Sequence, residues 1–204
     1  MTNDNQTPDD VDATEVDATE APETPEIVAA MAADAIAGAS TEESVQPKSA
    51  PDDRAQRGPF DVSEVTGVRP YIDLGGVKIL PRADLHLRLE VEEASKRVVA
   101  VGLEYHGTTL QVQPFAAPRS AGLWHDIREQ ILEQLRKQGA KAKPSNGPFG
   151  PEIFAEIPVN QDGKQGLRLA RFVGVDGPRW FRRGVIAGPG ATDADAAKEV
   201  EELF

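Results

Sequence analysis

The segment Asp176–Arg183, DGPRWFRR, concentrates the residue types best suited to binding a partner. It joins three arginines to a tryptophan and a phenylalanine, and Arg168 and Arg171 precede it on the same expected hairpin. Guanidinium groups beside aromatic rings can hold phosphates and stack on nucleic-acid bases, and they also suit anionic surfaces of proteins. The hairpin is therefore the first candidate for a binding surface.

Alternation along the strand qualifies this interpretation. Side chains two residues apart share a face, so Trp180 and Arg182 lie on one face and Arg179, Phe181 and Arg183 on the other. The arginines are thus divided between two surfaces. This division favours the alternative in which an aromatic residue enters the core while the arginines are solvated, are paired with carboxylates, or cover apolar surface with their stems.

A second candidate lies at residues 118–122, PRSAG, before an expected helix. The free N–H groups of a helix N-terminus, with Ser120 and Arg119 nearby, can bind an anion. The simpler alternative is that Ser120 caps the helix and Arg119 is exposed. Trp124 extends the apolar stripe of the helix, which favours the core over an exposed role. The candidate interaction surface predicted from both segments comprises Arg119, Trp124, Arg171, Asp176, Arg179, Trp180, Arg182 and Arg183.

The sequence carries no recognisable catalytic pattern. His86, His106 and His125 lack the spacing of metal ligands, and cysteine is absent. No G-x-S-x-G elbow occurs, and the glycine-rich stretches lack the features of phosphate-binding or dinucleotide-binding loops. We therefore predict a protein that is not an enzyme, with no catalytic residue, no metal and no cofactor.

Charge divides the chain near Gly58. Residues 1–57 contain 14 acidic and 3 basic residues and no aromatic residue, whereas residues 58–204 contain 20 acidic and 19 basic residues and all eleven aromatic ones. A strongly self-repelling segment without aromatics cannot bury enough apolar surface to offset its ordering entropy. We therefore predict a disordered acidic tail and linker over 1–57, followed by a single domain over 58–204.

Within the tail, residues 25–38 (PEIVAAMAADAIAG) place apolar side chains at helical spacing. Two alternatives stay open: a helix that forms only transiently, because so short an isolated segment is marginal in water, or a segment that folds on a partner's groove. The mixed composition of residues 47–57 predicts a linker.

The absence of cysteine suits a reducing compartment, the first residues do not resemble a secretory signal, and no apolar run is long enough to span a bilayer. These features predict a soluble, cytoplasmic protein without a membrane partner.

The elements expected after residue 58 are mainly strands. A helix with Ser120 as N-cap and Gly139 as its stop should be followed by a Pro/Gly loop over 143–152, and a last helix should run from Thr192 or Asp193 to Phe204. The expected strands are 71–80, 85–91, 97–105, 110–115, 153–159, 167–175 and 179–187. Gly75-Gly76 should interrupt the first run as a bulge or tight turn, and residues 85–91 alternate apolar with polar side chains, as in a strand with one buried face. The runs 85–91, 97–105 and 110–115 should form an antiparallel meander. The order β-β-β-β-α-β-β-β-α predicts an α+β fold with a mainly antiparallel sheet and helices packed on one face.

The segments 115–131 (FAAPRSAGLWHDIREQI), 147–152 (GPFGPE) and 171–185 (RFVGVDGPRWFRRGV), with 58–64 and 71–79, resemble an uncharacterised actinobacterial domain family of unknown function. The resemblance covers residues 58–204. It implies an actinobacterial, cytoplasmic protein and carries over no activity and no site residue.

Three functions follow as hypotheses. The first is a non-enzymatic interaction module that docks an unknown protein partner through residues 171–183 and 115–124, with an exposed arginine and tryptophan patch. The second is nucleic-acid or nucleotide binding through the basic hairpin 168–183, which should weaken with salt. The third is a small-ligand-binding domain or enzyme whose polar residues converge in a cleft.

Overall fold

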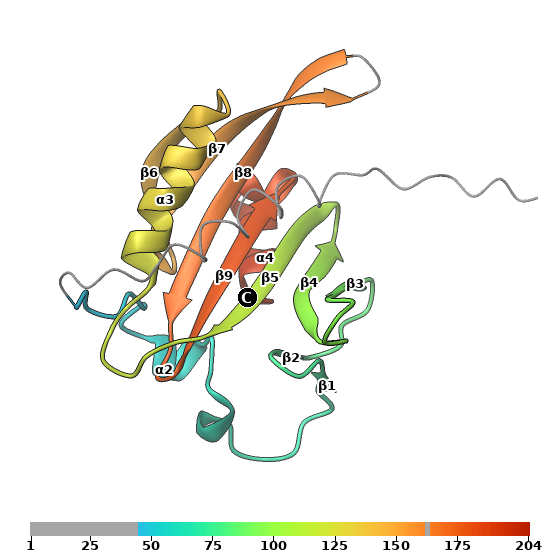
Figure 1. Ribbon diagram of the computed structural model, residues 1–204. Helices are drawn as coiled ribbons and strands as arrows, with labels where there is room; N and C mark the ends of the chain where they lie inside the picture. The colour runs from blue at the N-terminus through green and yellow to red at the C-terminus, as the bar shows by residue number, and fades with distance from the viewer. Residues whose placement is uncertain (1–44, 162–163) are drawn as a thin grey trace, which may run out of the picture.

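The computed structural model describes residues 45–161 and 164–204, and its core is one seven-stranded antiparallel sheet (Figure 1). The spatial order of the strands is β3-β4-β5-β9-β8-β7-β6. Their bounds are β3 His86–Val91, β4 Val98–Tyr105, β5 Thr108–Ala116, β6 Lys141–Gly147, β7 Gly150–Gln161, β8 Lys164–Asp176 and β9 Trp180–Ala187. A separate two-stranded ribbon pairs β1 (Ile72–Asp73) with β2 (Lys78–Ile79).

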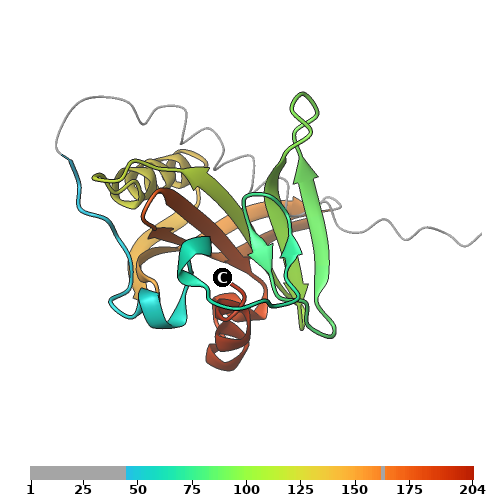
Figure 2. The same ribbon diagram turned by 90° about the horizontal axis from the view of Figure 1, so that it is seen from below.

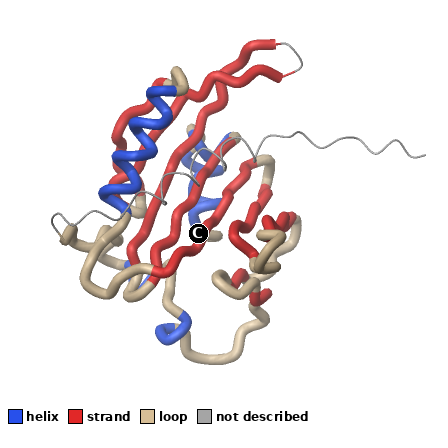
Figure 3. Tube along the Cα trace, in the orientation of Figure 1, coloured by secondary structure: helices blue, strands red, loops and turns tan. Residues whose placement is uncertain are grey.

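Among the described residues, helices are few beside the strands (Figure 3). The longest is α3, Trp124–Lys137, and α4 spans Ala194–Glu201 near the end of the chain. The shorter ones are α2, Arg54–Arg57, and two single turns of 3₁₀ helix, η1 Val62–Glu64 and η2 Pro189–Ala191. The predicted α+β class with a mainly antiparallel sheet is therefore confirmed.

The two longer helices lie on opposite faces of the sheet, not on one face as expected. On β8, Ala170 and Phe172 pack in the cluster that includes α3, whereas Val173 and Val175 pack with Val200 of α4. Both faces of this interior strand carry buried apolar side chains, so each face needs its own cover. Figure 2 shows α3 above the sheet and α4 below it, and the β1–β2 ribbon completes the α4 side.

The expected meander is present, since β3 pairs with β4 and β4 with β5, all antiparallel. The run 71–80 forms the hairpin β1–β2, and the interruption expected at Gly75-Gly76 is its turn, in which Gly75 adopts a positive φ of 84°. The stop of α3 is also as predicted. Gly139 has a φ of 80° and Ala140 N–H donates to Leu135 O, which closes the last helical turn.

Residues 143–152 do not form the loop that their prolines and glycines predicted. They lie in β6 and the first part of β7, joined by a tight turn in which Gly150 has a φ of 96°. Pro144 is tolerated because β6 is an edge strand, whose outer side needs no donor. The described residues after residue 58 therefore form nine strands, whereas seven were expected.

The segment predicted as a linker packs on the domain. Ser49 is buried, and Gly122 N–H donates to Gln46 O at 2.8 Å. We call residues 45–64, which run along one end of the sheet beside the β8–β9 turn, the strap. The predicted helical segment 25–38 lies outside the described residues. Among the described residues, no helix is long and apolar enough to cross a membrane.

Candidate interaction surfaces

Asp176, at the end of β8, is the point where the strap, α3 and the β8–β9 turn meet. Its carboxylate accepts the N–H of Ser49 and the N–H of Leu123, each at 2.9 Å, and that of Trp124 at 3.4 Å. The side chain is buried, with the residue only 2% exposed. A carboxylate from a distant strand therefore satisfies the first turn of α3, in place of the expected N-cap Ser120, which is exposed.

Trp124 is fully buried, as its place in the apolar stripe predicted. Its indole N–H donates to Pro151 O at 2.6 Å, and its ring lies 6.0 Å from that of Phe181. The ring also covers Gly174, where an added Cβ would lie 2.4 Å from it. Trp124 thus fixes α3 on the sheet and offers no surface to a partner.

Arg171 forms a buried ionic cluster on the α4 side of β8. Its guanidinium lies 2.9 Å from a Glu152 oxygen and 2.8 Å from a Glu201 oxygen. Burial alone would lower the pKa of Arg171, but the hydrogen bonds and charges of the two glutamates outweigh it, so the pKa is raised. The cluster ties α4 to the outer half of the sheet.

Arg182 and Arg183 point to opposite faces of β9, and burial lowers the pKa of each to about 10. Arg182 lies between two rings, 5.5 Å from Trp180 and 5.8 Å from Phe204, and donates to the Phe204 carbonyl. Arg183 lies 5.9 Å from the Phe115 ring and donates to Gln113. Both guanidinium groups are therefore engaged within the domain by aromatic and polar contacts.

The strap covers the remaining part of the hairpin. Trp180 is half-buried, its indole N–H donates to Asp61 at 2.9 Å, and Arg54 lies over its ring. Lys48 Nζ donates to the carbonyl oxygens of Pro118 at 2.9 Å and Gly177 at 2.6 Å. The two segments that were expected to dock a partner are therefore bound by the protein's own strap.

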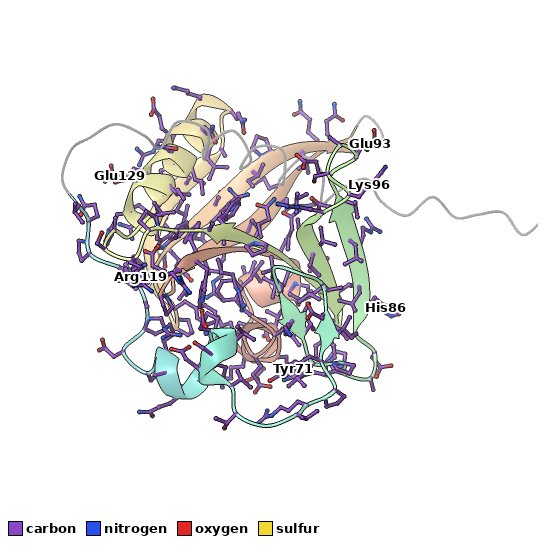
Figure 4. All side chains as sticks on the ribbon, turned by 60° about the horizontal axis from the view of Figure 1, so that its bottom comes forward. Tyr71, His86, Glu93, Lys96, Arg119 and Glu129 are labelled. Carbon is purple, nitrogen blue, oxygen red and sulfur yellow. The ribbon has the colours of Figure 1, made fainter. Side chains whose placement is uncertain are left out.

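Six of the eight predicted surface residues are thus buried or half-buried, and only Arg119 and Arg179 are exposed. Figure 4 shows Arg119 near the connection into α3. The expected arginine and tryptophan patch is not formed, because alternation sends the hairpin side chains into two cores. Within residues 45–161 and 164–204, no group of three or more His, Asp or Glu side chains is placed to hold a metal ion.

A different surface, which the sequence pattern did not indicate, is the outer edge of β3. Leu87, Leu89 and Val91 are 37%, 44% and 47% exposed, although their alternation with polar residues predicted one buried face. They share a face with Leu103 and Val101, their neighbours on β4, which are buried in the α4-side core. The α4-side core thus extends to the β3 edge of the sheet, where Leu87, Leu89 and Val91 form a last row of side chains that is open to solvent.

The described strands leave β3 paired on one side only, with β4. The strand lies at the margin of the molecule in Figure 1, and Figure 4 shows His86 directed outward from it. The opposite edge of the sheet, β6, contains Pro144, Lys141 and Lys143, the residue types that discourage strand pairing. β3, with the sequence HLRLEV, has neither proline nor lysine, so it is the edge better able to pair.

The fold and these surfaces define a small antiparallel-sheet protein of the α+β class with one open, apolar-flanked edge. The model of the family "Protein of unknown function (DUF3710)" matches residues 58–204, well over half of the chain. The chain therefore belongs to this family, as the resemblance of its motifs implied. The actinobacterial origin stays a prediction. Neither the curated proteins nor the solved structures contain a match.

Proposed function

We propose that this protein is a non-enzymatic, cytoplasmic interaction module that binds a protein partner through the outer edge of β3. The observation that carries the proposal is the open row of Leu87, Leu89 and Val91 on an edge strand. An extended segment that pairs with such an edge gains main-chain hydrogen bonds, and pockets for alternate side chains add specificity.

The charges of β3 also support selective pairing. Arg88 and Glu90 lie on the face opposite to the leucines, and Gln111 donates to Glu90, which holds its carboxylate in place. A partner strand therefore meets an apolar row on one face, and on the other the opposite charges of Arg88 and Glu90. Opposite charges directly across strands favour pairing, and like charges oppose it.

Nucleic-acid or nucleotide binding through hairpin 168–183 stays a prediction, as does a small-ligand site. The burial of Arg171 and Arg183 and the aromatic contacts of Arg182 weigh against the first, because phosphates need accessible guanidinium groups. No contact among the described residues favours either over the β3 edge.

The test compares two substitutions of exposed leucines. Leu89→Lys places a charge in the open row of β3, whereas Leu167→Lys places the same charge on β8 at a leucine that is 66% exposed. Both full-length variants and the wild type are used to capture proteins from a lysate of the source cells. Proteins retained by wild type and Leu167→Lys but lost with Leu89→Lys support the proposal. Identical recovery by all three proteins would contradict it.

A further inference from the structure

We propose that the partner of the β3 edge is β3 of a second copy of this chain, paired antiparallel about a two-fold axis at Leu89. This inference rests on the proposed function and names its partner. It would join two seven-stranded sheets into one continuous sheet across the axis, with the same surface contributed by both protomers.

The argument comes from the register of the strand with itself. When Leu89 lies opposite Leu89 of the second copy, Arg88 lies opposite Glu90, Glu90 opposite Arg88, and Leu87 opposite Val91. Every charged position then faces its opposite, and every apolar position faces an apolar one. In antiparallel strands, side chains directly opposite lie about 5 Å apart, which is close enough for these pairs to stabilise the contact.

Sliding one strand by two residues against the other keeps apolar faces together but brings like charges opposite each other. In one direction Arg88 then lies opposite Arg88 of the second copy, and in the other direction Glu90 lies opposite Glu90. Shifts by a single residue place leucines opposite charged side chains on the wrong face. The sequence of β3 thus specifies one self-pairing and disfavours its neighbours.

The geometry of the edge is compatible with this pairing. The irregularity between β3 and β4 places the extra residue, Val99, in β4, so β3 itself keeps a regular alternation. Leu87 and Leu89 extend the α4-side core through their neighbours Leu103 and Val101. A second copy would continue this core across the axis and cover the side chains that are now exposed.

The experiment uses charge reversal in the full-length chain. Arg88→Glu sets two glutamates opposite each other on both sides of the axis, and Glu90→Arg sets two arginines there. Each variant alone should weaken self-association by about tenfold or more. An equimolar mixture of the two variants should recover it, because each protomer then meets its opposite charge. Sedimentation velocity over a concentration series measures both results, and Arg119→Glu, an exposed reversal far from β3, is the control.

Glu90→Arg also removes the contact with Gln111, so thermal unfolding of each variant must show a folded protein. Leu89→Lys supplies an independent variant at the axis, where two ammonium groups would face each other. Recovery in the mixture, with the single variants dissociated, establishes the register. A monomeric wild type, or variants that associate as the wild type does, would overturn it. If a monomeric wild type still captures another protein through Leu89, the proposed function stands and only the second copy is excluded.

Discussion

Removal of the Asp176 carboxylate is the most informative test of how the domain is held together. Asp176→Ala leaves the N–H groups of Ser49 and Leu123 without the acceptor that each now meets at 2.9 Å, and it weakens the longer contact to Trp124. Hydrogen bonds to a buried charged group contribute about 1.5–3 kcal/mol each. Two such bonds give an expected loss of about 3–6 kcal/mol in the free energy of unfolding, measured by urea denaturation.

Asp193→Ala is the matched control. Asp193 caps the exposed start of α4 by accepting from Asp195 N–H and Ala196 N–H, so its loss should cost only about 1 kcal/mol. Hydrogen exchange should show faster exchange in the strap and at the start of α3 in Asp176→Ala alone. A loss below about 1 kcal/mol for Asp176→Ala, or no difference from Asp193→Ala, would refute the role assigned to this carboxylate.

Two further outcomes are expected. Gly174→Ala should destabilise the protein by about 3 kcal/mol or destroy its fold, since the new Cβ would lie 2.4 Å from the Trp124 ring, whereas Gly166→Ala, with 3.7 Å to its nearest neighbour, should change stability little in the same urea titration. The Arg54–Glu64 ion pair, with a shortest contact of 2.6 Å, predicts a pH dependence. The hydrogen bond from Arg54 lowers the pKa of Glu64 below its ordinary value of 4.5, so the contribution is complete above that pH and is lost as the pH falls through the lowered value. The stability difference between wild type and Arg54→Met should therefore be constant near neutral pH and shrink below about pH 4.5; a difference unchanged at pH 3 would contradict the assignment.

Much of the fold could be predicted because local patterns and tertiary structure agree. The alternation of 85–91 and the returns that follow it specify the meander, and the apolar stripe with Gly139 specifies α3. The edge strand β6 was missed, because Pro144 and the surrounding glycines are typical of loops. The missing N–H of Pro144 removes no hydrogen bond between strands when its strand lies at the edge of the sheet. Which strand lies at the edge is decided only by the assembled sheet. The side of the sheet that α4 covers depends on the same assembly.

The candidate site was less predictable, for a related reason. Residue types placed Arg171 and Arg183 among binding residues, yet the structure provides Glu152, Gln113 and aromatic rings that make their burial tolerable. These partners come from distant parts of the sequence. The open row of β3 was missed in the opposite sense, because alternation shows which side chains share a face but not whether anything covers that face.

The packing of the strap on the domain determines where a truncated fragment of this protein should begin. Similarity to the family begins at residue 58, but residues before it already pack on the domain, since Ser49 N–H donates one of the hydrogen bonds that the buried Asp176 carboxylate accepts. A fragment cut at residue 58 would bury that carboxylate with fewer partners and expose the ring of Trp180. Such a fragment should aggregate or unfold at lower temperature than the full-length protein. Any self-association of the fragment would then result from the surface exposed by the truncation and not from pairing of the β3 edge.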